Sequence, residues 1–123
     1  MSRKKIEANV RKNAIELMKE KGYISPVDLL IRMDRITMKQ VEDWRFKRIS
    51  YLERVTIGNL ANLNHILKAL RKFAQEQKLQ PSVTVYKSRG KGPKKRLQFS
   101  KTANPYMEEQ YATHYVQSKK PAE

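Results

Sequence analysis

Apolar positions mark two long helical stretches in this chain, one near the N-terminus and one in the middle. Along residues 2–20, Ile6, Val10 and Leu17 recur at the spacing that places side chains on one face of a helix, and charged residues fill most other positions. Along residues 60–79 the apolar residues repeat at the same spacing and form a wider stripe. We therefore expect an amphipathic first helix and a longer core helix.

Between these stretches, residues 24–48 carry the start signals of two short helices. Ser25 followed by Pro26 is typical of a helix start, and Thr37 with Gln40 has the form of a capping box. The two starts lie only twelve residues apart. This spacing predicts a helix of about two turns, a three-residue link and a second helix that continues to the end of the stretch. The layout is that of a helix-turn-helix.

The stretch resembles a helix-turn-helix in its apolar positions and differs from the common type in its turn. When Val27 takes the first position of the motif, four sites that are usually apolar hold Leu30, Ile36, Val41 and Trp44. Three other sites do not fit the motif, namely Ile31, Asp34 and Arg35. The resemblance implies a variant with a changed turn, whose second helix would present its N-terminal residues to bases. The same layout also occurs in helical bundles that do not bind DNA.

Beyond Pro81 the pattern changes from helical spacing to alternation. Residues 82–86 (SVTVY) and 96–100 (RLQFS) are rich in strand-forming residues, and the segment between them holds two glycines and a proline. We expect a β-hairpin over 82–100 with a long basic tip, in which apolar residues of both strands share one face. That face would consist of Val83, Val85, Leu97 and Phe99.

Two shorter segments complete the predicted order. Ser50 and Glu53 form a third capping-box pattern, so a helix is expected to follow residue 50. Asn104 followed by Pro105 predicts a last helix, with Tyr115 on its inner face.

The chain of 123 residues is expected to form one domain. We predict a mainly α fold of about five helices, with a helix-turn-helix-like core and one basic β-hairpin near the C-terminus. This single helical domain would cover residues 1–116, followed by a flexible tail at 117–123. Cysteine is absent, which excludes disulfides and thiolate metal sites and fits a reducing compartment. No apolar run approaches the ~20 residues of a membrane span, and the N-terminus lacks the apolar core of a signal peptide, so a cytoplasmic protein without membrane contact is expected.

Charge is the strongest global signal in the composition. The formal net charge is +15, from 27 Lys and Arg against 12 Asp and Glu. Residues 77–107 contain eight positive charges and no acidic residue. Such a surplus repels itself in the compact state unless a polyanion offsets it, and nucleic acid is the commonest polyanion. Ribosomes or acidic proteins are alternative partners that would use the same charge.

Residues for catalysis or metal binding are nearly missing from the sequence. His65 and His114 are far apart, and neither stands in a metal-ligand spacing. Gly90 and Gly92 lack the frame of a phosphate-binding loop. We therefore expect no enzyme activity, no metal and no cofactor.

The residues expected to contact nucleic acid lie on the second helix of the helix-turn-helix and on the hairpin. On the helix, Lys39 and Gln40 can reach base edges, although Gln40 can instead be used as a cap, and Thr37 can bond a phosphate. Phosphate contacts are also expected from the remaining cations of this helix, which are Arg45, Lys47 and Arg48. The hairpin tip resembles the wing of winged-helix proteins in charge and glycine content, and its candidate residues are Lys87, Arg89, Lys91, Lys94, Lys95 and Arg96. An ordinary solvated face is the alternative for each of these cations.

Double-stranded DNA binding without catalysis is the leading interpretation, with DNA favoured over RNA. The alternatives are an RNA- or ribosome-associated protein, in which Tyr86 stacks on an unpaired base, and a protein-interaction module with an acidic partner. A homodimer is also open, although no heptad seam indicates one. The pattern ISPVDLL…DWR…YLERV…GPKKRLQFS…YATHYV resembles a group of short, uncharacterised bacterial proteins over about residues 13–116, and this resemblance implies no activity.

Overall fold

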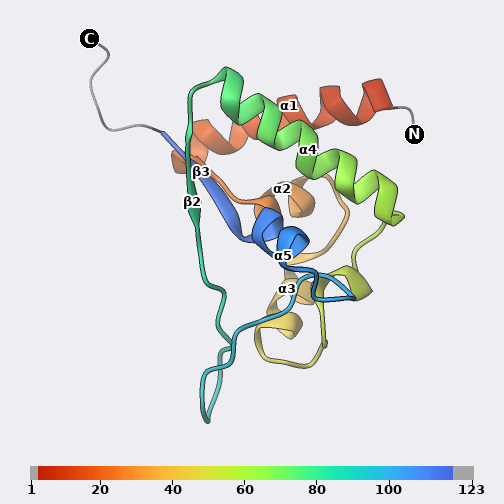
Figure 1. Ribbon diagram of the computed structural model, residues 1–123, viewed down its shortest axis with the longest axis vertical. Coiled ribbons are helices and arrows are strands. Elements are labelled where there is room, and N and C mark those ends of the chain that lie inside the picture. The colour runs from red at the N-terminus through yellow and green to blue at the C-terminus, as the bar shows by residue number, and fades with distance from the viewer. Residues whose placement is uncertain (1–2, 118–123) are drawn as a thin grey trace.

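The computed structural model describes residues 3–117, and this part of the chain contains five α-helices, one 3-10 turn and a three-stranded sheet (Figure 1). The helices are α1 (Arg3–Lys21), α2 (Pro26–Arg32), α3 (Met38–Arg45), α4 (Leu60–Glu76) and α5 (Pro105–Ala112), with the 3-10 turn η1 at Leu52–Arg54. The strands are β1 (Tyr23–Ile24), β2 (Gln80–Val83) and β3 (Thr113–Val116). The predicted mainly α fold with a strand pair near the C-terminus is confirmed. The flexible tail predicted at 117–123 lies outside the described residues, apart from Gln117.

The two long helices, α1 and α4, pack against each other and form much of the core (Figure 1). Ile6 and Val10 of α1 are fully buried, as are Ile66 and Leu70 of α4. These are residues of the two apolar stripes, so the predicted faces are confirmed for most of their length, and Leu60 at the start of α4 is exposed. The helix expected to be the longer, α4, ends at Glu76 and has 17 residues against 19 in α1. No helix among residues 3–117 is long and apolar enough to cross a membrane.

The two short helices α2 and α3 begin where the sequence predicts. The hydroxyl of Ser25 accepts a hydrogen bond from the backbone N–H of Asp28. The changed turn between them is made by Asp34, which adopts a left-handed conformation with φ 59°, a conformation that aspartate tolerates better than most residues. The predicted second helix was too long, because Lys47 has φ 64° and the helix ends at Arg45.

Two other segments differ from their predicted helices. The Ser50 capping pattern is followed only by the three-residue turn η1, whose start has no side-chain cap. The last helix ends at Ala112, and Thr113–Val116 forms strand β3. Thr, Tyr and Val favour extended backbone, and β3 has strand partners on both sides.

Strand β3 is the centre of the small antiparallel sheet, whose order is β1-β3-β2. Tyr115 pairs with Ile24 on one side and with Pro81 on the other. Pro81 is compatible with this position because β2 is an edge strand, where a missing N–H removes no ladder bond.

The predicted pairing of residues 82–86 with 96–100 is wrong for most of its length. Residues 84–98, named the arm from here on, leave the sheet after β2 and return with a single antiparallel bridge between Lys87 and Arg96. The predicted apolar face is wrong too. Val83 and Val85 are 53% and 52% exposed, whereas Leu97 and Phe99 are buried, because β2 takes its register from β3 and not from the returning segment.

Candidate nucleic-acid interface

The arm lies beside α3 and is bonded to it at two points. The backbone N–H of Arg89 donates a hydrogen bond of 2.8 Å to the carbonyl oxygen of Arg45. The indole N–H of Trp44, a side chain that is fully buried, donates one of 2.8 Å to the carbonyl oxygen of Gln98. Gly90 lies so close to Phe46 that a Cβ there would be 3.4 Å from the ring. The two predicted binding elements are therefore neighbours in space, and the arm projects from the body next to α3 (Figure 1).

Two carboxylates hold the segment that directly follows the arm, residues 99–101. The carboxylate of Glu108 on α5 accepts hydrogen bonds from the N–H of Phe99 and from both the N–H and the hydroxyl of Ser100. The carboxylate of Glu53 in η1 accepts from the N–H of Lys101 and from the hydroxyl of Tyr111. Burial and the bond to Glu53 raise the pKa of Tyr111. Both carboxylates carry a structural role that sequence reasoning missed. The partners of Glu53 lie about fifty residues away along the chain, and those of Glu108 lie eight or nine residues before it in a non-helical segment.

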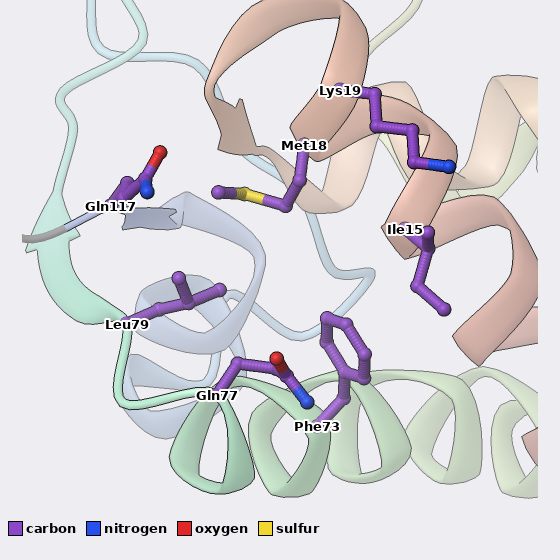
Figure 2. A pocket seen from close by; sticks show the side chains of 7 residues that line it. All are labelled: Ile15, Met18, Lys19, Phe73, Gln77, Leu79 and Gln117. Carbon is purple, nitrogen blue, oxygen red and sulfur yellow. The ribbon is translucent and has the colours of Figure 1, made fainter.

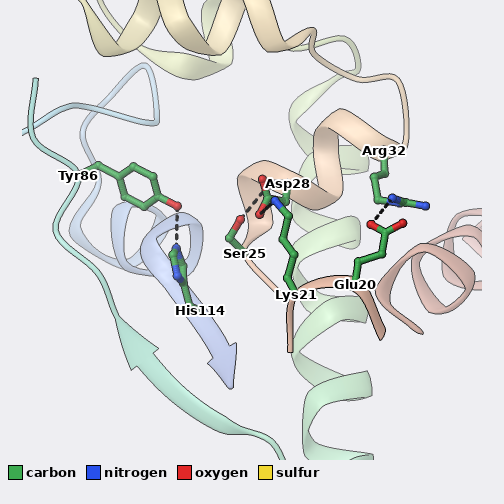
Figure 3. Close-up of polar contacts among 7 residues, drawn as sticks. All are labelled: Glu20, Lys21, Ser25, Asp28, Arg32, Tyr86 and His114. Carbon is green, nitrogen blue, oxygen red and sulfur yellow. Dashed lines mark hydrogen bonds and ion pairs between the residues drawn. The ribbon is translucent and has the colours of Figure 1, made fainter. Parts of the chain in front are cut away.

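Tyr86 belongs to an enclosed aromatic cluster at the outgoing end of the arm. Its hydroxyl lies 2.7 Å from Nε2 of His114 in a hydrogen bond (Figure 3). Its ring packs against those of Trp44 and Phe99. Burial raises the pKa of Tyr86 to about 12 and lowers that of His114 below its ordinary value. The ring is half-buried, and stacking of an unpaired base on it would compete with these packing contacts.

Two predicted base-reading or phosphate-binding residues at the start of α3 form its cap. The hydroxyl of Thr37 accepts from the N–H of Gln40 at 3.1 Å, and Oε1 of Gln40 accepts from the N–H of Thr37 at 3.0 Å. A two-point contact from Gln40 to adenine needs that oxygen, so the contact would break the cap.

Three further predicted residues lie on or just after α3, and two of them are partly neutralised. Asp43 forms ion pairs with Arg48 at 3.0 Å and with Lys39 at 3.2 Å, and these contacts lower the pKa of Asp43. Both cations remain well exposed, at 59% and 77% of their side chains. Lys47 follows the helix and is exposed.

A hollow of about 660 Å³ separates α3 from the outgoing half of the arm. Among its lining residues are three of the predicted binding residues, Lys39, Arg45 and Arg89. Asp28 also lines it and is engaged by Lys21 at 3.0 Å (Figure 3). Glu42, the other carboxylate of this hollow, is exposed.

Among the residues that the structure describes, no carboxylate compensates the cations of the arm. None of the six forms an ion pair with any residue of the described range 3–117. The arm is closed near its end by two hydrogen bonds between Ser88 and Lys95, and Nζ of Lys94 donates to the carbonyl oxygen of Gly90. All six predicted arm cations are exposed, and they are Lys87, Arg89, Lys91, Lys94, Lys95 and Arg96.

A second hollow, between the C-terminal ends of α1 and α4, has a different character (Figure 2). It measures about 300 Å³ and is lined mainly by the apolar side chains of Ile15, Met18, Phe73 and Leu79. Lys19, Gln77 and Gln117 complete its lining. Of the described residues that line this hollow, only Lys19 carries a charge.

Neither a metal site nor a known relative indicates a function. Within residues 3–117 no group of three or more His, Cys, Asp or Glu is placed to hold a metal ion. No family model matches the chain, and no curated protein and no solved structure is significantly similar to it. The arrangement of its own residues is therefore the basis for a functional proposal.

Proposed function

We propose that this protein binds double-stranded nucleic acid, DNA in preference to RNA, and that it does so without catalysing a reaction. The binding surface would be formed by α3 together with the arm. One observation carries the proposal: the hydrogen bond from Arg89 to Arg45 joins the arm to the end of α3, and Lys39, Arg45 and Arg89 of these two elements line one hollow. A phosphate polymer can lie across both elements only if they are adjacent.

The charges support the same proposal. The chain carries a net charge of +15, and the six arm cations have no carboxylate partner within residues 3–117. Contacts from these cations to phosphates would release counterions, which is the main source of sequence-independent affinity for DNA. The two glycines of the arm, both with positive φ, allow its backbone to follow the duplex closely.

The contribution of α3 would be a weak sequence preference. Of its eight residues only Trp44 is buried, and Met38, Lys39 and Glu42 are exposed to a ligand. Because Gln40 is used as a cap, Lys39 is the residue at the start of α3 that remains available to a base edge. We expect contacts to phosphates, which position the protein on the duplex, to contribute more to binding than contacts to base edges.

The enclosed ring of Tyr86 favours a duplex over a single strand. Proteins that prefer single strands stack bases on exposed aromatic rings. Here the ring packs against Trp44, Phe99 and Arg45. An RNA-binding mode that depends on this ring is therefore disfavoured.

A competition assay tests the proposal. A labelled DNA duplex of about 20 base pairs is displaced by duplex DNA, duplex RNA or single strands, and the series is repeated at salt concentrations around ~0.1 M. We expect duplex DNA to compete best and the logarithm of the binding constant to fall linearly with the logarithm of salt concentration. Stronger competition by RNA or by single strands contradicts the preference. Lack of binding to every nucleic acid near ~0.15 M salt contradicts the proposal itself and favours an acidic protein partner.

A further inference from the structure

Arg45 is a cation whose surroundings within the fold leave its charge uncompensated. Its guanidinium lies over the ring of Tyr86, 5.2 Å from the centroid. Its Nε is buried and has no hydrogen-bond partner, and its side chain forms no ion pair with any residue from 3 to 117. A buried charged donor without an acceptor is unfavourable, so this position is suited to a ligand that supplies one.

A second arginine is directed to the same place. Arg89 is bonded through its backbone to Arg45 and lines the same hollow. Burial and the positive charge of Arg89 both lower the pKa of Arg45. The carboxylates nearby do not offset this repulsion, because Asp28 is engaged by Lys21 and Glu42 forms no ion pair with Arg45. Two like charges held together in this way favour an anion between them.

We propose that the hollow between α3 and the arm binds one phosphodiester group of a nucleic-acid backbone between the guanidinium groups of Arg45 and Arg89. This inference rests on the proposed function and names the contact that fixes the duplex on the surface. Guanidinium groups recognise phosphate through paired N–H donors. Because the guanidinium of Arg45 already packs over the ring of Tyr86, little side-chain freedom is lost when the phosphate binds.

This site differs in its physical role from the end of the arm. Lys91, Lys94 and Lys95 are exposed, and an ammonium group acts on phosphates as a point charge. The guanidinium of Arg45 packs over Tyr86 and the backbone of Arg89 is bonded to that of Arg45, so a phosphate bound there sets the position of the duplex relative to α3. The site is therefore expected to contribute to affinity and to orientation, and the lysines mainly to affinity.

Single substitutions of the two arginines test the site by fluorescence anisotropy with the same DNA duplex. We expect Arg45→Gln and Arg89→Gln each to weaken binding by about fivefold or more and to reduce the salt slope by about one unit. Arg45→Lys keeps the charge and loses the two-point contact, so it should retain the slope and recover affinity only in part. Lys68→Gln is the matched control, because Lys68 is exposed on α4 and this helix lies away from the arm (Figure 1). It should behave almost like the unchanged protein.

Nuclear magnetic resonance gives a direct second readout. The Nε–H signal of Arg45 should shift on addition of the duplex and should be unaffected by an uncharged solute of similar size. A shift with inorganic phosphate alone, and none with the duplex, would assign the hollow to free phosphate and overturn the proposal. Since Arg89 is exposed, Arg89→Gln tests the site even if thermal melting shows that Arg45→Gln disturbs the packing on Tyr86.

A comparison with a third variant distinguishes failure of the phosphate site from failure of duplex binding. Replacement of Lys94, Lys95 and Arg96, named the tip triplet, tests duplex binding in general. If the tip-triplet variant loses affinity while both arginine variants bind normally, duplex binding stands and the phosphate site is refuted. If neither the tip-triplet variant nor the arginine variants lose affinity, both proposals fail.

Discussion

Replacing Glu108 with alanine should loosen the base of the arm, and the size of the effect can be worked from its contacts. The carboxylate accepts three hydrogen bonds, from Phe99 N at 2.8 Å, Ser100 N at 2.6 Å and Ser100 Oγ at 2.7 Å. A hydrogen bond to a charged group contributes about 1.5–3 kcal/mol, and a donor left without an acceptor costs a similar amount. These contributions are not additive, and water can replace part of the lost carboxylate because the site is only partly buried. We therefore expect the free energy of unfolding to fall by about 2–4 kcal/mol, a large share of the ~5–15 kcal/mol typical of a domain.

Urea unfolding followed by circular dichroism measures this change. Glu108→Ala should lower the midpoint without changing the dependence on urea, because the surface exposed on unfolding is nearly the same. Glu108→Gln keeps one carbonyl oxygen and should lie between alanine and the unchanged protein. Glu109→Ala is the matched control, since Glu109 is the next residue of α5, is exposed and has no side-chain partner among residues 3–117. Equal losses for Glu108→Ala and Glu109→Ala would refute the reasoning.

Three other predictions concern binding and pH. Replacing the tip triplet with glutamine should weaken binding to all duplex sequences alike and reduce the salt slope by about one unit per lost phosphate contact, and unchanged anisotropy would contradict this. Replacing Lys39 with glutamine should alter sequence preference in a binding selection, and an equal loss for every sequence would show that Lys39 does not read bases. Burial lowers the pKa of folded His114, so as the pH falls below ~6.5 the unfolded chain binds the proton first. The contribution of neutral His114 to stability is therefore complete above about pH 6.5 and is lost as the pH falls. His114→Gln should make the urea midpoint decrease less steeply below that pH, and an equally steep decrease in this variant would exclude a role of His114 in the acid sensitivity.

The starts of the helices could be predicted because the hydrogen bonds that define them are local. Ser25 caps α2 and Thr37 caps α3 through residues only three positions away. Asn104 likewise caps α5 through its oxygen. Such contacts depend on the nearest neighbours in the chain, so the sequence contains all the information they need.

The helix predicted to follow Ser50 does not form, because a distant segment bonds the backbone N–H groups at its start. The N–H groups of Leu52 and Glu53 donate to the carbonyl oxygens of Gln98 and Phe99. These bonds hold the start of η1 against the returning end of the arm, and a continuous helix does not form there. A capping-box pattern involves residues close along the chain, so it cannot indicate that a distant segment bonds the same N–H groups.

The sequence predicted which residues of two elements could contact nucleic acid, without predicting how their charges are paired. Every candidate cation proved to be at least partly exposed, but their pairing depends on the tertiary structure. Lys39 and Arg48 share Asp43, whereas Arg45 meets Arg89 without a carboxylate partner among residues 3–117. The sequence does not distinguish these two situations.

By itself, the sequence determined the helical stripes, the caps of the short helices and the presence of a basic glycine-containing segment. These features depend on the spacing of residues that are close along the chain. Only the tertiary structure decided that β2 pairs with β3 and that the arm lies beside α3. The physical reason is that alternating apolar and polar residues favour an extended segment but do not determine which strand it pairs with. That choice depends on groups that meet only in the folded chain. Here the indole of Trp44, far away in the sequence, holds Gln98, and the carboxylate of Glu108 on α5 holds Phe99 and Ser100.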